Sequence, residues 1–375
     1  MSIPAKPSRL PYIDNIRIFC TVLVVLQHAA VTYSGMGSWY NTERTSLDLP
    51  SMLIFGVFQS HTQAFFMSLF FLLAGYFIPA ALERKGPKDF LYDRLLRLGV
   101  PLLVYVFALH PLIVKILHPE MNFGAYYSKG LLSLGFISWT GPLWFVEALL
   151  IFTIACLPFA QWLKPRPAAP DAKLPAGKMW LLVVLITALA FAIRLVYPVG
   201  TSVANLQFCY FAAYMVAFVV GVLAGKHSWF ELISYGSSKH WLIASFSLGL
   251  PLWLGSTVAG GVAEGRTDFN GGMNVAALGY AFWESFFCVA IIIAIIGIAR
   301  EKLNFQQPWM RFLSDNSFGV YVFHALVLVL ISLALRSLAL AALPKFAVVS
   351  LLALVGSFAA AAVIRQVPLL RRLFS

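Results

Sequence analysis

The sequence predicts an all-α, polytopic membrane protein, a bundle of about ten transmembrane helices. Of its 375 residues, 60% are apolar and only 11% are charged, whereas soluble domains are about half apolar and a quarter charged. Apolar runs of about 20 residues, long enough to cross a bilayer, recur from one end to the other. The runs are continuous, not alternating, and backbone in lipid must satisfy its own hydrogen bonds, so helices are expected instead of a barrel.

The apolar runs place the elements in order along the chain. The predicted spans are 15–34, 62–82, 97–117, 143–163, 179–197, 206–225, 241–260, 273–299, 316–335 and 344–364. They are expected to form a single membrane domain over residues 1–375, with an exposed, proline-rich linker at about 164–178. Between the first two spans, SMLIFGVFQSH (51–61) is too short to cross and too apolar for a simple loop. It is expected to be an interfacial or re-entrant piece over an outer cavity.

The basic residues predict the orientation of the bundle. Nineteen Lys and Arg residues fall on one side of the predicted spans and seven on the other, with Arg17 inside the first span. By the positive-inside rule, the richer side, with both termini and the linker, faces the cytoplasm. The net charge of +12 is spread over short loops, and no basic patch with stacking aromatics indicates a nucleic acid partner.

The cysteines carry no sign of chemistry. All four lie within predicted spans and lack metal-ligand spacing: Cys20, Cys156, Cys209 and Cys288. Neither a disulfide framework nor a metal site is expected. The first apolar run has span length and no small-residue cleavage site after it, so no cleavable signal peptide is expected either.

The first span contains three ionisable residues, Asp14, Arg17 and His28. Such groups are unfavourable in lipid, so each is a candidate functional residue. Arg17 and His28 are separated by about three helical turns, roughly 16 Å along the axis, and share one face. Asp14 can pair with Arg17 and orient it. The alternatives are structural: a histidine bonded to a neighbouring helix, and an arginine that reaches to the interface.

Four motifs, in matching order, resemble those of the acyltransferase family 3 membrane proteins. They are D-N-I-R followed by ten residues and His28, FFMSLFFLLAGYF (65–77), DRLLRLGVP (93–101) and SFGVYVFHA (317–325). The residues of these motifs also resemble those of the branch that succinylates periplasmic glucans. The resemblance covers nearly the whole chain and implies transfer of an acyl group, acetyl or succinyl, from cytoplasmic acyl-CoA to a carbohydrate hydroxyl at the outer face of the inner membrane. Acyl-CoA is then a co-substrate, and no bound cofactor is implied.

Within this reading, His28 is the candidate base that takes the acceptor's proton, because neutral imidazole suits that task near pH 7. Arg17 stabilises the oxyanion or holds part of the donor. Arg94 and Arg97, one turn apart, are candidates for binding the CoA phosphates, although the positive-inside rule alone also explains them.

Further candidates lie on three other spans. Ser317, Tyr321 and His324 form one helical stripe, which either joins helices or, for Tyr321 and His324, lines the acyl-CoA site. Glu147, Trp144 and Glu284 are candidate acceptor-binding residues, and Trp144 and Trp283 can stack on a sugar ring or anchor the interface. His110–Pro111 is interpreted as a kink.

Two other classes of function remain open at this stage. A transporter or flippase for a sugar-bearing lipid or small solute would also place charge and aromatic groups inside the membrane, but no inverted repeat is visible. A structural or sensory membrane protein would explain neither the Arg17–His28 face nor the loop arginines. The acyl group, the acceptor and the oligomeric state are left undetermined by the sequence.

Overall fold

The fold is described from a computed structural model that covers residues 10–43, 47–166 and 176–374. Its elements are helices, and the chain is 79% helical with no strand among the described residues. The α-helices are α1 (Pro11–Ser34), α2 (Leu49–Tyr76), α3 (Ile78–Arg94), α4 (Val100–Val104), α5 (His110–Leu117), α6 (Phe123–Leu132), α7 (Trp144–Ala155), α8 (Ala176–Arg194), α9 (Phe211–His227), α10 (Tyr235–Ser247), α11 (Gly249–Ala259), α12 (Val275–Lys302), α13 (Pro308–Ala334), α14 (Ala342–Ile364) and α15 (Pro368–Leu373). The predicted all-α class is confirmed.

Within the described ranges, 10 helical stretches are long and apolar enough to cross a membrane, which confirms the predicted number. They are Pro11–Ser34, Leu49–Tyr76, Ile78–Leu117, Gly141–Phe159, Gly177–Arg194, Phe208–His227, Tyr235–Ala259, Val275–Lys302, Pro308–Ala334 and Ala342–Ile364. Of the predicted linker at 164–178, residues 167–175 lie outside the described residues, and its last three residues belong to α8.

Residues 51–61 do not form the separate re-entrant piece that the sequence suggests. They form the first turns of α2, which starts well before the predicted residue 62. The helix begins there because the side chain of Asp48 accepts a hydrogen bond from the Ser51 backbone N–H at 2.9 Å, an N-cap. The same bonds from Ser51 lower the pKa of the Asp48 carboxyl.

The third span also differs from its prediction, because the helical stretch already starts at Ile78 and runs to Leu117, with a kink at Gly86. Two π-helical segments interrupt it, η1 (Leu95–Gly99) and η2 (Tyr105–Leu109). Such wider turns shift which side chains share a face. Arg94 and Arg97 therefore lie within this long element and not at its start.

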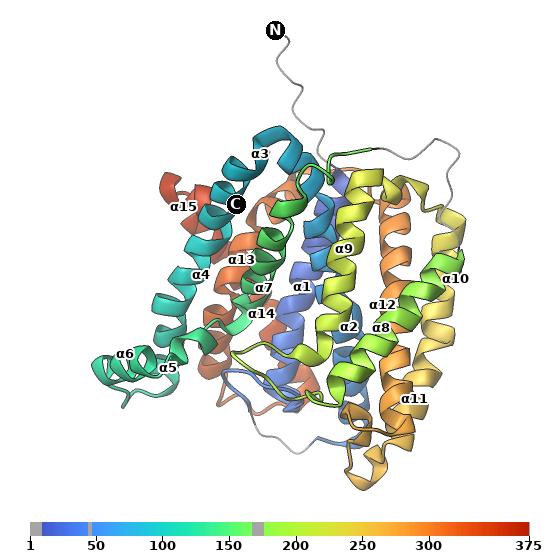
Figure 1. Ribbon diagram of the computed structural model, residues 1–375. Coiled ribbons are helices and arrows are strands. Elements are labelled where there is room, and N and C mark those ends of the chain that lie inside the picture. The colour runs from blue at the N-terminus through green and yellow to red at the C-terminus, as the bar shows by residue number, and fades with distance from the viewer. Residues whose placement is uncertain (1–9, 44–46, 167–175, 375) are drawn as a thin grey trace.

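The bundle packs around two helices (Figure 1). α12 is the most buried of the candidate spans, and α1 contacts α2, α12, α13 and α14. The tightest approach is between α2 and α9, where added Cβ atoms at Gly221 and Gly225 would collide with the backbone carbonyls of Leu72 and Tyr76. This is the close packing of a G-x-x-x-G pair in membrane helices.

Two basic residues that the sequence places among the outer loop charges are instead buried in ion pairs. Arg194 bonds to Glu284, and Lys345 bonds to Glu43 through an Nζ–Oε1 contact of 2.6 Å. Both basic side chains are almost fully shielded from solvent. The first pair joins α8 to α12, and the second joins α14 to the segment between α1 and α2. Both pairs satisfy the rule that a buried charge requires a partner.

Candidate active site

A cavity of about 860 Å³ lies at the end of the bundle where α1 ends, and His28 is part of its wall. Beside aliphatic and small residues, many aromatic and amide side chains line the cavity. These include Gln27, Trp39, Tyr40, Gln59, Gln63, His110, Trp144, Asn205, Gln207, Tyr210, Tyr214, Trp253, Phe269, Asn270, Tyr280 and Tyr321. Flat rings together with fixed donors and acceptors are what binding of a ligand with many hydroxyl groups requires.

His28 is held from two sides. Its ring stacks on the indole of Trp39, with ring centroids 3.8 Å apart. On α13, His324 Nε2 lies 3.0 Å from His28 Nδ1. His324 is completely buried and is not part of the cavity wall, whereas His28 is.

The hydrogen bonds fix which nitrogen of His28 carries the proton. His324 Nδ1 lies 2.8 Å from the Tyr321 carbonyl oxygen, and since a carbonyl can only accept, His324 Nδ1 donates. In a neutral imidazole the other nitrogen then accepts. His324 Nε2 is therefore the acceptor, and His28 Nδ1 is the donor. The lone pair of His28 is left on Nε2, the arrangement that a general base requires.

Two other predicted residues lie on the same cavity wall. The Tyr321 hydroxyl donates to the Pro142 carbonyl, which joins α13 to the loop before α7. Trp144 stacks on Tyr214, with centroids 5.5 Å apart, and Gln63 donates to the Tyr214 hydroxyl at 3.1 Å. His324, predicted on the acyl-CoA site together with Tyr321, instead contacts His28.

Sequence reasoning missed a second polar chain on this wall. The Tyr40 hydroxyl lies 2.6 Å from His110 Nδ1 and 3.0 Å from the Tyr105 hydroxyl, and His110 Nε2 lies 3.0 Å from the Tyr126 hydroxyl. Burial raises the pKa of Tyr40, so it stays protonated. Gly141 leaves room for this chain, since a Cβ there would lie 2.6 Å from the Tyr40 oxygen.

The other two ionisable residues of the first span, Asp14 and Arg17, lie at the opposite end of α1. Arg17 pairs with Asp14 at 3.6 Å, as the i, i+3 spacing predicts, and its guanidinium lies 4.8 Å from the centre of the Phe77 ring. Arg94 stacks on Phe90, with 5.1 Å from the guanidinium carbon to the ring centre. None of Asp14, Arg17 and Arg94 is part of the cavity wall near His28.

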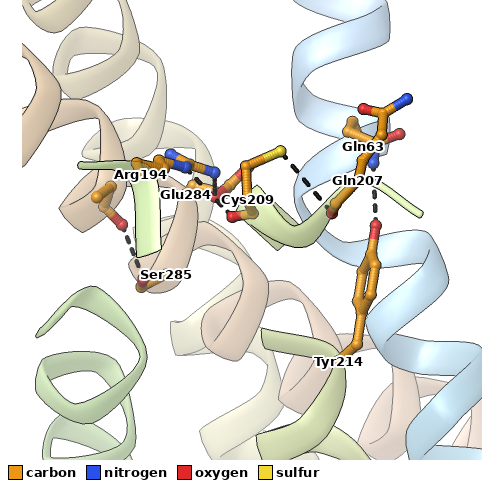
Figure 2. A network of polar contacts seen from close by, with 8 residues as sticks. Gln63, Arg194, Gln207, Cys209, Tyr214, Glu284 and Ser285 are labelled. Carbon is orange, nitrogen blue, oxygen red and sulfur yellow. Dashed lines mark hydrogen bonds and ion pairs between the residues drawn. The ribbon is translucent and has the colours of Figure 1, made fainter. Parts of the chain in front are cut away.

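Glu284 is not part of the cavity wall and bonds to Arg194 (Figure 2). Its carboxylate accepts from Arg194 Nη2 at 2.5 Å, and Arg194 Nε donates to the Cys209 carbonyl at 3.3 Å. The Arg194 guanidinium also lies near the rings of Tyr210 and Tyr280, which do line the cavity. Glu284 thus supports that wall through Arg194.

Glu147, in the first turn of α7, is half-buried. Its Oε2 atom is shielded from solvent and has no hydrogen-bond partner among the described residues. The structure does not place it on the cavity wall.

Fold and site together define a polytopic helical membrane protein with a histidine-centred cavity at one end of the bundle. An acyltransferase domain family matches residues 10–362, nearly the whole chain. Relatives include the glucans biosynthesis protein C of Salmonella heidelberg (strain SL476), of Salmonella agona (strain SL483) and of Salmonella enteritidis PT4 (strain P125109). Each is 25% identical over 343 residues, which cover 86% of this chain and 83% of the relative. No solved structure matches the chain.

The chain belongs to this acyltransferase family, and it is an enzyme that transfers an acyl group. The family resemblance expected from the four sequence motifs is confirmed.

Proposed function

We propose that this protein transfers an acyl group, acetyl or succinyl, from cytoplasmic acyl-CoA to a hydroxyl of a cell-envelope glucan. The observation that carries the proposal is the orientation of His28, whose unprotonated Nε2 belongs to a side chain on the wall of an aromatic- and amide-lined cavity. The names of the relatives, glucans biosynthesis protein C, support a glucan as the acceptor.

The reaction follows from this arrangement. His28 Nε2 takes the proton of the acceptor hydroxyl as its oxygen attacks the thioester carbonyl. The new C–O bond forms, the C–S bond breaks, and the leaving sulfur takes the proton back from the imidazolium. The products are the acyl ester and free CoA thiol. His324 keeps the Nδ1–H of His28 in place throughout, because its own donor is committed to the Tyr321 carbonyl.

The acceptor occupies the large cavity, where Trp144, Tyr214 and Trp253 offer flat faces for sugar rings. Amide groups such as those of Gln63 and Gln207 offer fixed bonds to hydroxyls. Glu284 acts on this wall indirectly, through Arg194 and the rings of Tyr210 and Tyr280.

The donor enters from the opposite end, near Arg17 and Arg94, and its flexible arm extends along α1 toward His28. Asp14 holds Arg17 at that end. Arg17 and His28 are separated by about 16 Å along α1. This separation supports the path, because a donor and an acceptor on opposite sides of the membrane can meet only if the donor's arm extends through the bundle. The protein then sits in the bacterial inner membrane with the cavity facing outward and both termini in the cytoplasm.

Transfer of label from [¹⁴C]acyl-CoA to a linear β-glucan in proteoliposomes tests the proposal. Wild-type protein is expected to label the glucan, and His28→Ala to lower kcat by about 10²–10⁴-fold without loss of insertion. Phe19→Ala, on an exposed face of α1 and outside the cavity lining, is the control and should retain most of the turnover. Near-wild-type turnover of His28→Ala, or movement of glucan across the bilayer without labelling, would contradict the proposal.

A further inference from the structure

A second cavity, of about 780 Å³, lies away from His28 and has a different character. It lies between the π-helical segment η1 and the chain that follows α14, including α15, which packs against η1. Figure 1 shows α15 near the labelled C-terminus. The cavity is lined by Asp93, Arg97, Arg365, Gln366, Pro368 and Arg371, with Leu96.

The charge of this lining is positive. Its one carboxylate, Asp93, is bonded to Lys85 at 2.9 Å and to Arg97 at 3.1 Å. The other two guanidinium groups of the lining are those of Arg365, whose Nε has no hydrogen-bond partner among the described residues, and of Arg371, which is exposed. The lining contains no second carboxylate to balance these two charges.

The position of Arg365 distinguishes this cavity from an ordinary charged helix end. The positive-inside rule places arginines where water satisfies them. The Nε–H of Arg365, however, is shielded from solvent and has no partner among the described residues. A buried hydrogen-bond donor without an acceptor is unfavourable. A ligand that brings an acceptor atom into the cavity would satisfy this donor.

Arg97 belongs to this cavity and Arg94 does not. Arg97 lies on the wall one helical turn after Asp93, with which it forms an ion pair. Arg94 instead lies over the Phe90 ring.

We propose that this cavity binds a phosphate-bearing ligand through Arg365 and Arg371, with Arg97 at its edge. Guanidinium groups form paired, charge-assisted hydrogen bonds with phosphate oxygens, and the volume falls in the range of about 300–1,000 Å³ typical of small-molecule sites. The phosphate belongs either to the nucleotide end of the acyl donor or to the headgroup of an anionic lipid. The first source rests on the proposed function, whereas the site itself does not.

Equilibrium binding to purified protein tests this site and separates the two sources. One arm measures binding of radiolabelled adenosine 3′,5′-bisphosphate to protein in phosphatidylcholine nanodiscs. The other arm uses native mass spectrometry to count phosphatidylglycerol retained by protein from mixed nanodiscs. Each arm compares wild type with Arg365→Gln/Arg371→Gln and with Arg311→Gln, an exposed arginine at the same end of the α13–α14 hairpin and outside the cavity lining.

The double variant is expected to lose at least about tenfold in affinity in one arm, with Arg311→Gln unchanged. Loss in the first arm assigns the site to a nucleotide, and loss in the second arm assigns it to a lipid headgroup. If the Gln variant fails to fold, Arg365→Lys/Arg371→Lys replaces it. This variant keeps both charges, so binding should weaken less than tenfold. Some weakening is still expected because lysine lacks the paired donors.

Equal binding by wild type and the Gln variant in both arms, or no binding by wild type in either arm, would overturn the site. Neither arm measures acyl transfer. Protein that binds the bisphosphate but never labels glucan would contradict the proposed function and leave this site intact.

Discussion

His324 Nε2 lies 3.0 Å from His28 Nδ1, although 296 positions separate the two residues in the chain. The contact joins the first and the ninth candidate spans and gives the two imidazoles different tasks. One faces the cavity, and the other, fully buried, holds it in a single tautomer. In the proposed mechanism, His324 is thus a positioning residue and not part of the reacting surface.

Replacing His324 by Ala is expected to lower kcat by about tenfold or more, short of the roughly 10²–10⁴-fold loss expected for the base itself. His324→Gln keeps a side-chain oxygen as acceptor and should retain more activity. Steady-state kinetics on acyl-CoA and glucan provide the measurement. A raised KM for acyl-CoA at unchanged kcat would instead support the donor-binding role that the sequence predicts for His324.

Arg17→Lys is expected to be severely impaired if Arg17 makes a forked contact with the donor, because lysine keeps the charge but not the paired donors. Asp14→Asn should be milder, since it only loosens the orientation of Arg17. Transfer rates of the two variants at matched expression give the order. Full activity of Arg17→Lys would show that only positive charge is required at this end of α1.

Glu284→Gln should destabilise the protein by about 3–5 kcal/mol, because it leaves the buried Arg194 without its counter-ion. Glu147→Gln is the matched control, as the half-buried Glu147 has no ion pair among the described residues. Thermal unfolding in detergent compares the two. An unchanged Tm with a raised KM for glucan would assign Glu284 to direct acceptor binding.

Gly221→Ala is expected to destabilise the α2–α9 contact by about 1–3 kcal/mol, because the added methyl group would collide with the Leu72 carbonyl. Gly255→Ala on α11 is the same substitution in open space, and it should be neutral or slightly stabilising because alanine favours helices. Unfolding transitions of the purified variants check the difference, which should disappear if α2 and α9 do not pack closely.

Cysteine accessibility in a cysteine-free background tests the orientation. Thr42→Cys is expected to react with an impermeant maleimide in intact cells, and Pro170→Cys only after permeabilisation, because the basic residues follow alternate loops. Labelling of position 170 in intact cells with position 42 protected would reverse the proposed topology.

Much of the fold was predictable because span length and hydropathy are local properties. The predicted start of α2 is too late because the apolar run begins after the helix does, although Asp48 and Ser51 form a helix-start signal. The third span is predicted too short for a related reason, since the kinked segment Ile78–Arg94 that precedes it is polar.

The candidate site was predictable only in part. Chain spacing shows that Arg17 and Asp14 can pair, but not that His28 meets His324 or that Arg194 meets Glu284. Those contacts depend on how distant helices pack. Trp39 lies in a loop without a periodic pattern, so nothing local indicated its stacking on His28.

The His28–His324 contact also bears on the order in which the protein is made. The ribosome delivers α1 long before α13, so during that interval a nascent chain carries the proposed base without the histidine that selects its tautomer. Trp39 and Tyr40 follow α1 at once, but Tyr40 must still wait for His110. In the proposed mechanism, activity therefore begins only after α13 has been made and packed against α1.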